Sequence, residues 1–442
     1  MEKVLFSPIG GTDPISNDRD GAMLHICRVY KPDIVYLYLS KEMMAFHRQN
    51  NRYLYCLEKL GELLGHTFHT EIIAREDLEE VQIFDPFIDE YRDILQYILK
   101  KHKECELYLN VSSGTPAMKS ALQILGVLSE ETMKIIQVNT PEKKINPHKE
   151  KHDDYDVDIY WECNEDNDPE KFKNRCHESQ TKNLLDEMKI QNILRHIKSY
   201  DYIAALREAG TLAEPLSKRA QDYLEAAHYR TQLHIYGIQE KLGKDKESIL
   251  PIRDEKSRNI FEHLLNLQCK LIKEEYVDFI RGLTPVVVDL FQVALKEMGG
   301  ISYKEYTYVD QKGVEKWDQA KVKQNPELYQ AFLNAFGLGV SFGPIYSSNL
   351  LPCIEAFSKN EEIIKLSKEL RQIEEGTRNL AAHEIVSVTK RWVVKHSGGY
   401  TPEEIFEKLK RYSQILDLGI RSEYWNSYDD MNRILIDLIK RR

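Results

Sequence analysis

Long apolar runs and paired cysteines are both missing from this sequence. No stretch approaches the roughly 20 apolar residues that a membrane-spanning helix needs, and the N-terminal apolar run is too short for the core of a signal peptide. The chain has seven cysteines, an odd number, and no Cys-x-x-Cys pair. We therefore expect a cytoplasmic protein with reduced thiols and no membrane association.

An excess of positive charge is also missing, because 71 acidic residues outnumber 61 basic ones. The formal net charge is -10 at pH 7, which argues against a chain-wide basic coat for nucleic acid, because non-specific binding depends on neutralising phosphates. Any RNA or DNA site must be local. The 442 residues, 42% hydrophobic and 30% charged, suit a globular protein, and such a length favours about two or three domains.

The N-terminal third of the chain alternates short β-rich runs with helical patterns. β-rich composition predicts strands at 4–10, 33–39, 69–74, 105–112 and 134–139. Apolar residues at helical spacing predict helices within 42–64, 86–102 and 116–128. This order predicts βαβ units and a mainly parallel, Rossmann-like sheet.

Two glycine-containing loops follow the first and fourth predicted strands. They read Gly-Gly-Thr-Asp-Pro (10–14) and Ser-Ser-Gly-Thr-Pro (112–116), and ligands of such sheets bind at the carboxyl ends of the strands. Free N–H groups and hydroxyls before a helix can hold phosphate, although each loop alone is equally typical of a turn and helix cap. Two such loops at one sheet edge favour a nucleotide-like ligand. Neither is a Walker A sequence or a dinucleotide fingerprint, which argues against a nucleotide-dependent oxidoreductase.

A polar, charged stretch from about 141 to 172 predicts a domain boundary. Within it, VDIYWE (157–162) is expected to form a last strand. The remainder has helical patterns, except that residues 301–317 alternate like a hairpin around Gln-Lys-Gly. A ligand-sensing transcription regulator would need a helix-turn-helix with a basic recognition helix, which the acidic C-terminal half does not display.

The segment EEGTRNLAAHEIV (374–386) carries the clearest chemical pattern in the helical part. It continues a helix whose apolar face is predicted to hold Ile363, Leu366, Leu370, Ile373 and Leu380. Arg378 and His383 would lie about 140° apart on a regular helix, so they do not resemble a metal-binding pair at i and i+4. The small residues Ala381 and Ala382 allow close approach of another backbone or of RNA, and a two-fold interface would supply two copies of the pair.

The residue types suit cleavage of RNA by its own 2′-hydroxyl without a metal ion. His383 titrates in the range needed for proton transfer. Arg378 is always charged and can stabilise the phosphoryl oxygens. Asn379 is positioned to orient the substrate or the arginine.

The spacing also occurs twice elsewhere. In Arg258 to His263, the residues Ile260 and Phe261 are expected to be core positions, so we interpret this pair as structural. Arg391 to His396 is expected to belong to a basic surface beside the main site, with a solvated helix face as the alternative. We predict RNA contacts there from Lys390, Arg391 and Lys395.

RNLAAHE resembles the R-x4-6-H signature of HEPN ribonucleases, and GGTDP and SSGTP on a Rossmann-like sheet resemble the loops of CARF domains. In this order they resemble the Csm-type accessory ribonucleases of type III CRISPR systems over essentially the whole chain. The resemblance implies an α/β Rossmann-like CARF sensor (1–172), an all-α connector (173–255) and a HEPN ribonuclease domain (256–442).

It further implies a homodimer that binds cyclic oligoadenylate made by the CRISPR interference complex, and then cuts single-stranded RNA without metal or other cofactor. The products would carry 2′,3′-cyclic phosphate and 5′-hydroxyl ends. Arg378, Asn379 and His383 would be catalytic. Likeness to the streptococcal and enterococcal branch favours the hexa-adenylate over the tetra-adenylate, and some relatives slowly cleave their activator. The residues implied for activator binding are Gly11, Thr12, Ser113, Gly114, Thr115 and Asn139.

Overall fold

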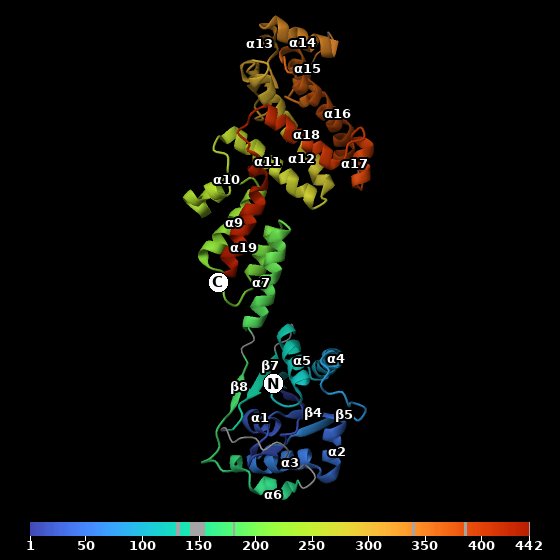
Figure 1. The fold of residues 1–442 in the computed structure, drawn as a ribbon, viewed down its shortest axis with the longest axis vertical. Helices are drawn as coiled ribbons and strands as arrows, with labels where there is room; N and C mark the ends of the chain where they lie inside the picture. The colour runs from blue at the N-terminus through green and yellow to red at the C-terminus, as the bar shows by residue number, and fades with distance from the viewer. Residues whose placement is uncertain are drawn as a thin grey trace. The chain divides into compact units, whose positions relative to one another are not determined.

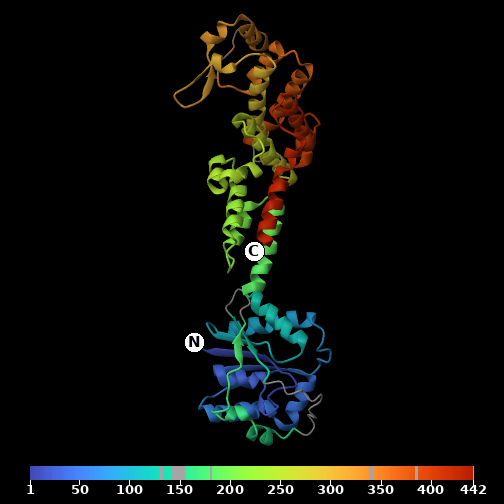
Figure 2. The ribbon, with the colours of Figure 1, turned by 60° about the vertical axis from the view of Figure 1, so that its left-hand side comes forward.

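The computed structural model describes residues 1–129, 133–141, 155–179, 182–337, 340, 342–383 and 387–441, with the backbone alone for 182–183 and 378–383. It divides into two compact units, Met1–Met188 and Lys189–Arg442 (Figures 1 and 2). All seven cysteines are free, as predicted. No helix in the described part of the chain combines the length and apolar character that a membrane crossing requires.

The N-terminal unit is built on a six-stranded sheet with the order β5-β4-β1-β6-β7-β8. Neighbouring strands are parallel, except that β8 runs antiparallel to β7. The Rossmann-like sheet and its five predicted strands are therefore confirmed. The bounds are β1 Lys3–Pro8, β4 Ile34–Ser40, β5 His69–Arg75, β6 Glu106–Asn110, β7 Met133–Val138 and β8 Cys176–Glu178.

Helices cover both faces of this sheet (Figure 1). Because successive strand residues point to opposite faces, Leu5 packs with α1 and α3, whereas Val4 and Phe6 pack with α4 and α5. The result is a three-layer αβα sandwich. The bounds are α1 Ala22–Tyr30, α2 Lys41–Asn50, α3 Arg52–Leu64, α4 Asp85–Lys101 and α5 Pro116–Leu128.

One strand prediction is wrong. VDIYWE forms the helix α6, Val157–Glu162, because the carboxylate of Asp156 caps it by accepting from the N–H groups of Asp158 and Ile159. Val157 is the one buried residue of this helix and Ile159 is exposed, so the segment does not bury alternate residues as a strand of the sheet would. Three short elements also belong to this unit: the paired strands β2 Ile15–Ser16 and β3 Arg19–Asp20, and the 3₁₀ turn η2 Glu165–Asn167.

The C-terminal unit is helical, as predicted, around one core. Its 3₁₀ turns are η3 Gly243–Ser248, η4 Tyr303–Tyr306 and η6 Ser422–Asn426. Its helices, with the α7 that leads into it, are α7 Lys182–Lys198, α8 Tyr202–Ala209, α9 Lys218–Thr231, α10 Ile235–Leu242, α11 Glu255–Ile272, α12 Tyr276–Glu297, α13 Gln319–Lys323, α14 Pro326–Phe336, α15 Ser347–Phe357, α16 Glu361–His383, α17 Lys390–His396, α18 Pro402–Ile415 and α19 Ser427–Lys440.

The last helix of this unit packs against the first ones. The hydroxyl of Tyr202 in α8 donates to Asn432 in α19 at 2.8 Å. The buried guanidinium of Arg230 in α9 donates to Glu262 in α11 at 2.7 and 3.0 Å. The predicted hairpin is present as β9 Thr307–Val309 and β10 Glu315–Trp317, and it extends from the helices (Figure 2).

Candidate functional site

The loops that follow β1 and β6 meet at one edge of the sheet. From β1 the strand order proceeds through β4 and β5 on one side and through β6 and β7 on the other. The chain direction across the sheet therefore reverses between β1 and β6, which is the switch point where open α/β sheets bind ligands. Loop 10–14 and loop 112–116 both emerge at this point, at the carboxyl ends of their strands.

Glycine lets the two loops touch through their backbones. A Cβ atom on Gly10 would lie 2.7 Å from the backbone nitrogen of Gly114. Gly114 itself has a φ of 85°, a left-handed conformation that residues with a side chain rarely adopt. Both glycines are therefore required for this close approach.

Two buried polar side chains that the sequence analysis did not single out shape the loops. The carboxylate of Asp13 accepts from the N–H groups of Gly10 at 3.0 Å and Met23 at 3.1 Å. Burial raises the pKa of Asp13 despite these bonds. Asn110 accepts from the N–H groups of Ser112 at 2.9 Å and Ser113 at 3.3 Å. Asn110 forms an Asx turn, because its side chain accepts from the N–H two residues further along the chain, whereas Asp13 accepts from an N–H three residues before it and from the start of α1.

The exposed part of the edge presents backbone donors. Gly11 and Thr12 are exposed. In the described residues we find no hydrogen-bond partner for the N–H groups of Gly11, Thr12 or Gly114. Lys119, in the first turns of α5, lies close enough for its charge to lower the pKa of Asp13. Unpaired N–H groups at the start of α5, with a lysine nearby, suit an anion such as phosphate.

Three of the predicted ligand residues already have partners in the fold. Ser113 is 2% exposed, and its N–H binds Asn110. The hydroxyl of Thr115 donates to the carbonyl of Val81 at 2.6 Å and accepts from the N–H of Met118 at 3.3 Å, so it caps α5. Asn139 is exposed, but its N–H and carbonyl both bond to Arg175. Direct ligand contact by these residues stays a prediction.

In the C-terminal unit, the predicted catalytic segment lies at the end of α16. Ile363, Leu366, Leu370 and Ile373 are buried, which confirms these positions of the apolar face. The helix continues through His383. The side chains of Arg378, Asn379, Leu380 and His383 lie outside the described part of the structure, so their roles stay predictions.

Helix α17 packs against α16 just before this segment. A Cβ atom on Gly376 would overlap the carbonyl oxygen of His396, so the two helices approach through their backbones. Lys390, Arg391 and Lys395 are exposed on α17, and Lys390 also pairs with Glu403 at 2.6 Å. Three basic residues thus lie on the helix next to the predicted catalytic helix.

The other Arg-x4-His pairs have structural contacts. Ile260 and Phe261 are buried, as predicted, and Nε2 of His263 donates to the carbonyl of Gly282 at 2.8 Å. Arg258 and His263 also line a cavity of about 740 Å³ in this unit. His396 donates from Nδ1 to the carbonyl of Trp392 at 2.8 Å. Both histidines are therefore held by main-chain oxygens.

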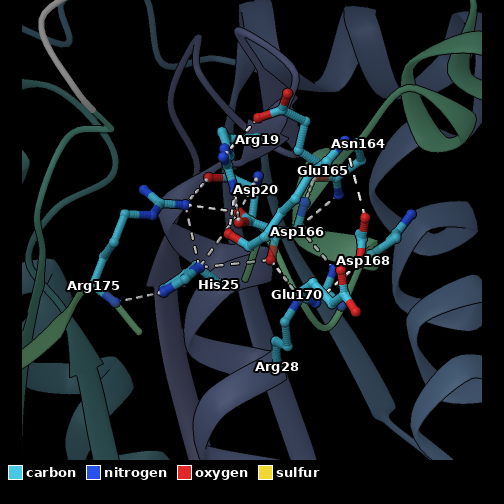
Figure 3. Close-up of polar contacts among 12 residues, drawn as sticks. Arg19, Asp20, His25, Arg28, Asn164, Glu165, Asp166, Asp168, Glu170 and Arg175 are labelled. Atoms are coloured by element: carbon cyan, nitrogen blue, oxygen red, sulfur yellow. Dashed lines mark hydrogen bonds and ion pairs between the residues drawn. The ribbon is translucent and has the colours of Figure 1, made fainter. Parts of the chain in front are cut away.

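A buried polar cluster in the N-terminal unit joins β3, α1, the 3₁₀ turn η2 and the residue before β8 (Figure 3). The carboxylates of Asp20 and Asp166 and the ring of His25 lie close enough to hold a metal ion. However, Asp20 receives a two-pronged bond from Arg28, at 2.6 and 2.9 Å, and Asp166 binds Arg19 at 2.9 Å and Arg175 at 3.1 Å.

The imidazole of His25 is also unsuitable as a metal ligand. Its Nε2 accepts from the N–H of Arg175 at 2.9 Å, and its Nδ1 lies 3.2 Å from the guanidinium of Arg175 and 3.6 and 3.8 Å from Asp20 and Asp166. Burial alone would raise the pKa of Asp166, but bonds from His25 and Arg19 hold it well below the ordinary value. The cluster is an ion-pair network, because the arginines already neutralise its carboxylates.

Comparison with known proteins agrees with this architecture. Models of three successive domains match the chain: the Csm6 CARF domain at residues 69–176, the Csm6 6H domain at 179–231 and the Csm6 HEPN domain at 249–436. The chain belongs to the Csm6 family. The CARF match covers the loop 112–116, and the HEPN match contains residues 378–383.

Relatives in this family match over all or part of their length. The CRISPR system endoribonuclease Csm6 of Mycobacterium tuberculosis is 29% identical over 92% of this chain and 94% of its own. Csm6 of Enterococcus italicus is 34% identical over 46% of this chain and 47% of its own. The solved structure of Enterococcus italicus Csm6 bound to cyclic hexa-2′-fluoro-hexa-dAMP has the same fold, with a TM-score of 0.70, 20% identity and coverage of 99% and 100%.

Proposed function

We propose that this chain is a CRISPR endoribonuclease that cyclic oligoadenylate activates through the sheet unit. The observation that carries the proposal is the meeting of loops 10–14 and 112–116 at the switch point of the sheet, in a chain whose α16 ends in Arg-Asn-Leu-Ala-Ala-His. The first feature suits a phosphate-rich ligand, and the second suits metal-free RNA cleavage. The family membership supports joining the two in one enzyme.

The activator would contact the sheet edge mainly through backbone groups. Gly11, Thr12 and Gly114 offer N–H groups, and the hydroxyl of Thr12 adds a donor. Ser113 and Thr115 would contribute chiefly by shaping the second loop, and Asn139 would line the neighbouring edge after β7. A homologous structure holds a cyclic hexa-adenylate analogue, which supports the hexamer over the tetramer.

Cleavage would proceed at the end of α16 by attack of an RNA 2′-hydroxyl on the adjacent phosphate. His383 would take or return the proton, Arg378 would stabilise the charge on the phosphoryl oxygens, and Asn379 would orient one of them. No metal or other cofactor takes part in this route. The products would be a 2′,3′-cyclic phosphate and a 5′-hydroxyl.

The working form would be a cytoplasmic homodimer with one copy of the segment 378–383 from each protomer facing a shared site. We place the CARF sensor at 1–172, the helical connector at 173–255 and the HEPN domain at 256–442. Lys390, Arg391 and Lys395 would guide single-stranded RNA toward the site. Slow cleavage of the activator within the sheet unit is a separate prediction, tested by following intact cyclic hexa-adenylate with His383→Ala protein.

The proposal is tested by incubating purified protein with labelled single-stranded RNA and with duplex DNA, each with no activator, cyclic tetra-adenylate or cyclic hexa-adenylate. We expect RNA cleavage that rises with the hexamer and persists in EDTA, and no DNA cleavage. Ligand-dependent binding of duplex DNA without RNA cleavage would instead identify a transcription regulator.

A further inference from the structure

Arg175 connects both sides of the proposed activator site. It directly precedes β8, the last strand before α7, and its side chain is 13% exposed. Its Nη1 donates to the carbonyl of Asn139 at 3.0 Å, and its Nη2 donates to the carbonyl of Asp20 at 2.8 Å. One guanidinium therefore binds two main-chain segments that are far apart in sequence. Figure 3 shows its position beside Asp20 and Asp166.

Both segments continue from the predicted ligand residues. Asn139 follows β7 and is itself a predicted ligand residue. Asp20 ends the hairpin that continues from loop 10–14, and the N–H of Gly21 returns to the carbonyl of Pro14 at 2.7 Å. A shift of either rim on ligand binding would therefore move a carbonyl that Arg175 binds.

Asp166 gives Arg175 a fixed anchor between these two contacts. Its carboxylate is 2% exposed and accepts from the N–H of Asp20 at 3.0 Å as well as from Arg19 and Arg175. The planar guanidinium has five donors in a rigid fork, so it can hold three acceptors at once, whereas a lysine ammonium acts as a point charge. The backbone of Arg175 also pairs with Asn139 and His25.

We propose that Arg175 is a positioning residue that couples occupancy of the activator site to β8, and so to activation of RNA cleavage. This inference rests on the proposed function. A ligand activates only through its different affinity for two states, and the two states must differ at some contact that the ligand moves. The guanidinium of Arg175 is that contact, because it joins both rims of the site to the strand that leaves the unit.

The test compares wild-type protein with Arg175→Met, measuring cyclic hexa-adenylate affinity by calorimetry and RNA cleavage at saturating activator. We expect the variant to bind the activator within about threefold of wild-type affinity. Its maximal activated rate should fall by about fivefold or more, the lower end of typical allosteric coupling. Arg175→Lys should also keep the activator affinity and lose maximal rate. This variant replaces Arg175→Met in the test if the methionine variant does not fold.

Arg28→Met is the matched control, because Arg28 belongs to the same buried network and binds Asp20 through its carboxylate instead of its carbonyl. We expect lower thermal stability but a wild-type maximal rate per folded molecule. An unchanged maximal rate in Arg175→Met, loss of its activator binding, or an equal fall in Arg28→Met would each overturn the inference. A wild-type protein that ignores cyclic oligoadenylates would instead refute the proposed function.

Discussion

RNIFEH (258–263) and RNLAAH (378–383) share their first two residues, their spacing and their last residue, and both lie in helices of the C-terminal unit. Their surroundings differ. In α11, Ile260 and Phe261 are core residues, and His263 is bonded to the carbonyl of Gly282. In α16 the corresponding positions are Leu380 and Ala381, and α17 packs closely just before them.

We infer that such a spacing becomes a catalytic site only when the neighbouring residues leave its side chains free to meet a substrate. Large apolar residues between arginine and histidine bury the helix face against its own unit, and the histidine then satisfies a main-chain oxygen. Small residues leave room for another backbone or for RNA. The following substitutions test this contrast, in order of decreasing effect on RNA cleavage.

Replacing His383 with alanine should have the largest effect. Loss of a general acid or base typically lowers the rate by about 10²- to 10⁴-fold, while the melting temperature and oligomeric state should stay the same. The measurement is the rate of RNA cleavage at saturating activator. Wild-type activity in this variant would remove His383 from the chemistry.

Thr12 and Thr115 provide a similar comparison in the sheet unit, because Thr12 is exposed whereas the hydroxyl of Thr115 is bonded within the fold. The exposed hydroxyl of Thr12 should bind activator phosphate, and losing such a bond costs about 1.5 to 3 kcal/mol. Thr12→Ala should therefore raise the activator concentration for half-maximal cleavage by about one to two decades, with little change in the maximal rate. Thr115→Ala removes a helix cap and should mainly lower the free energy of unfolding, by about 0.5 to 2 kcal/mol. An unshifted Thr12→Ala titration would contradict our placement of the site.

Gly376→Ala tests the close contact between α16 and α17. The added methyl group would meet the carbonyl of His396, and such overpacking costs about 1 to 3 kcal/mol. Part of this loss of stability is offset, because alanine is more favourable than glycine within a helix by about 1 kcal/mol. We expect a lower melting temperature and slower RNA cleavage. Gly343→Ala is the control, since a Cβ there has open space; equal effects in both variants would refute the contact.

Arg391→Ala should have a smaller effect, on binding more than on chemistry. An exposed arginine that contacts phosphate contributes to affinity without sequence information. We expect the RNA concentration for half-maximal rate to rise severalfold, with a shallower dependence on salt and an unchanged maximal rate. Steady-state kinetics at two salt concentrations would show this. A lower maximal rate with unchanged half-saturation would assign Arg391 a catalytic role.

Arg258→Ala and His263→Ala should have the smallest effect on catalysis. His263→Ala leaves the Gly282 carbonyl without its donor, which costs about 1 to 3 kcal/mol of stability. Cleavage per folded molecule should remain near wild type in both variants. A folded but inactive Arg258→Ala protein would mean that the first of the two segments is the catalytic one.

The sequence predicts the sheet well because its strands are short, apolar and separated by helical patterns. It fails where that signal is weak. β8 is a three-residue edge strand, Cys-His-Glu, without apolar alternation, and VDIYWE has strand-forming residues but follows a capping aspartate, Asp156. The single helical pattern predicted for 42–64 is two helices, because Asn51 adopts a φ of 51° between them.

The candidate site was only partly predictable for a related reason. Gly10 and Gly114 stand out because glycine permits close backbone contact. The residues that shape the loops do not stand out, since Asn110 donates to Ser7 and Arg175 donates to Asn139, which are contacts between segments far apart in the chain. Thr115 stands out in the sequence, but its role does not follow from its residue type. A threonine before a helix suits phosphate binding and also the helix cap that Thr115 forms here.

The proposed function is tested most directly by the rate of cleavage of labelled single-stranded RNA, in EDTA, with and without cyclic hexa-adenylate, for wild type, His383→Ala and His263→Ala. We expect strong activation of wild type and His263→Ala, and cleavage by His383→Ala that is slower by about 10²-fold or more. A wild-type rate that ignores every cyclic oligoadenylate, or an active His383→Ala beside an inactive His263→Ala, would contradict it.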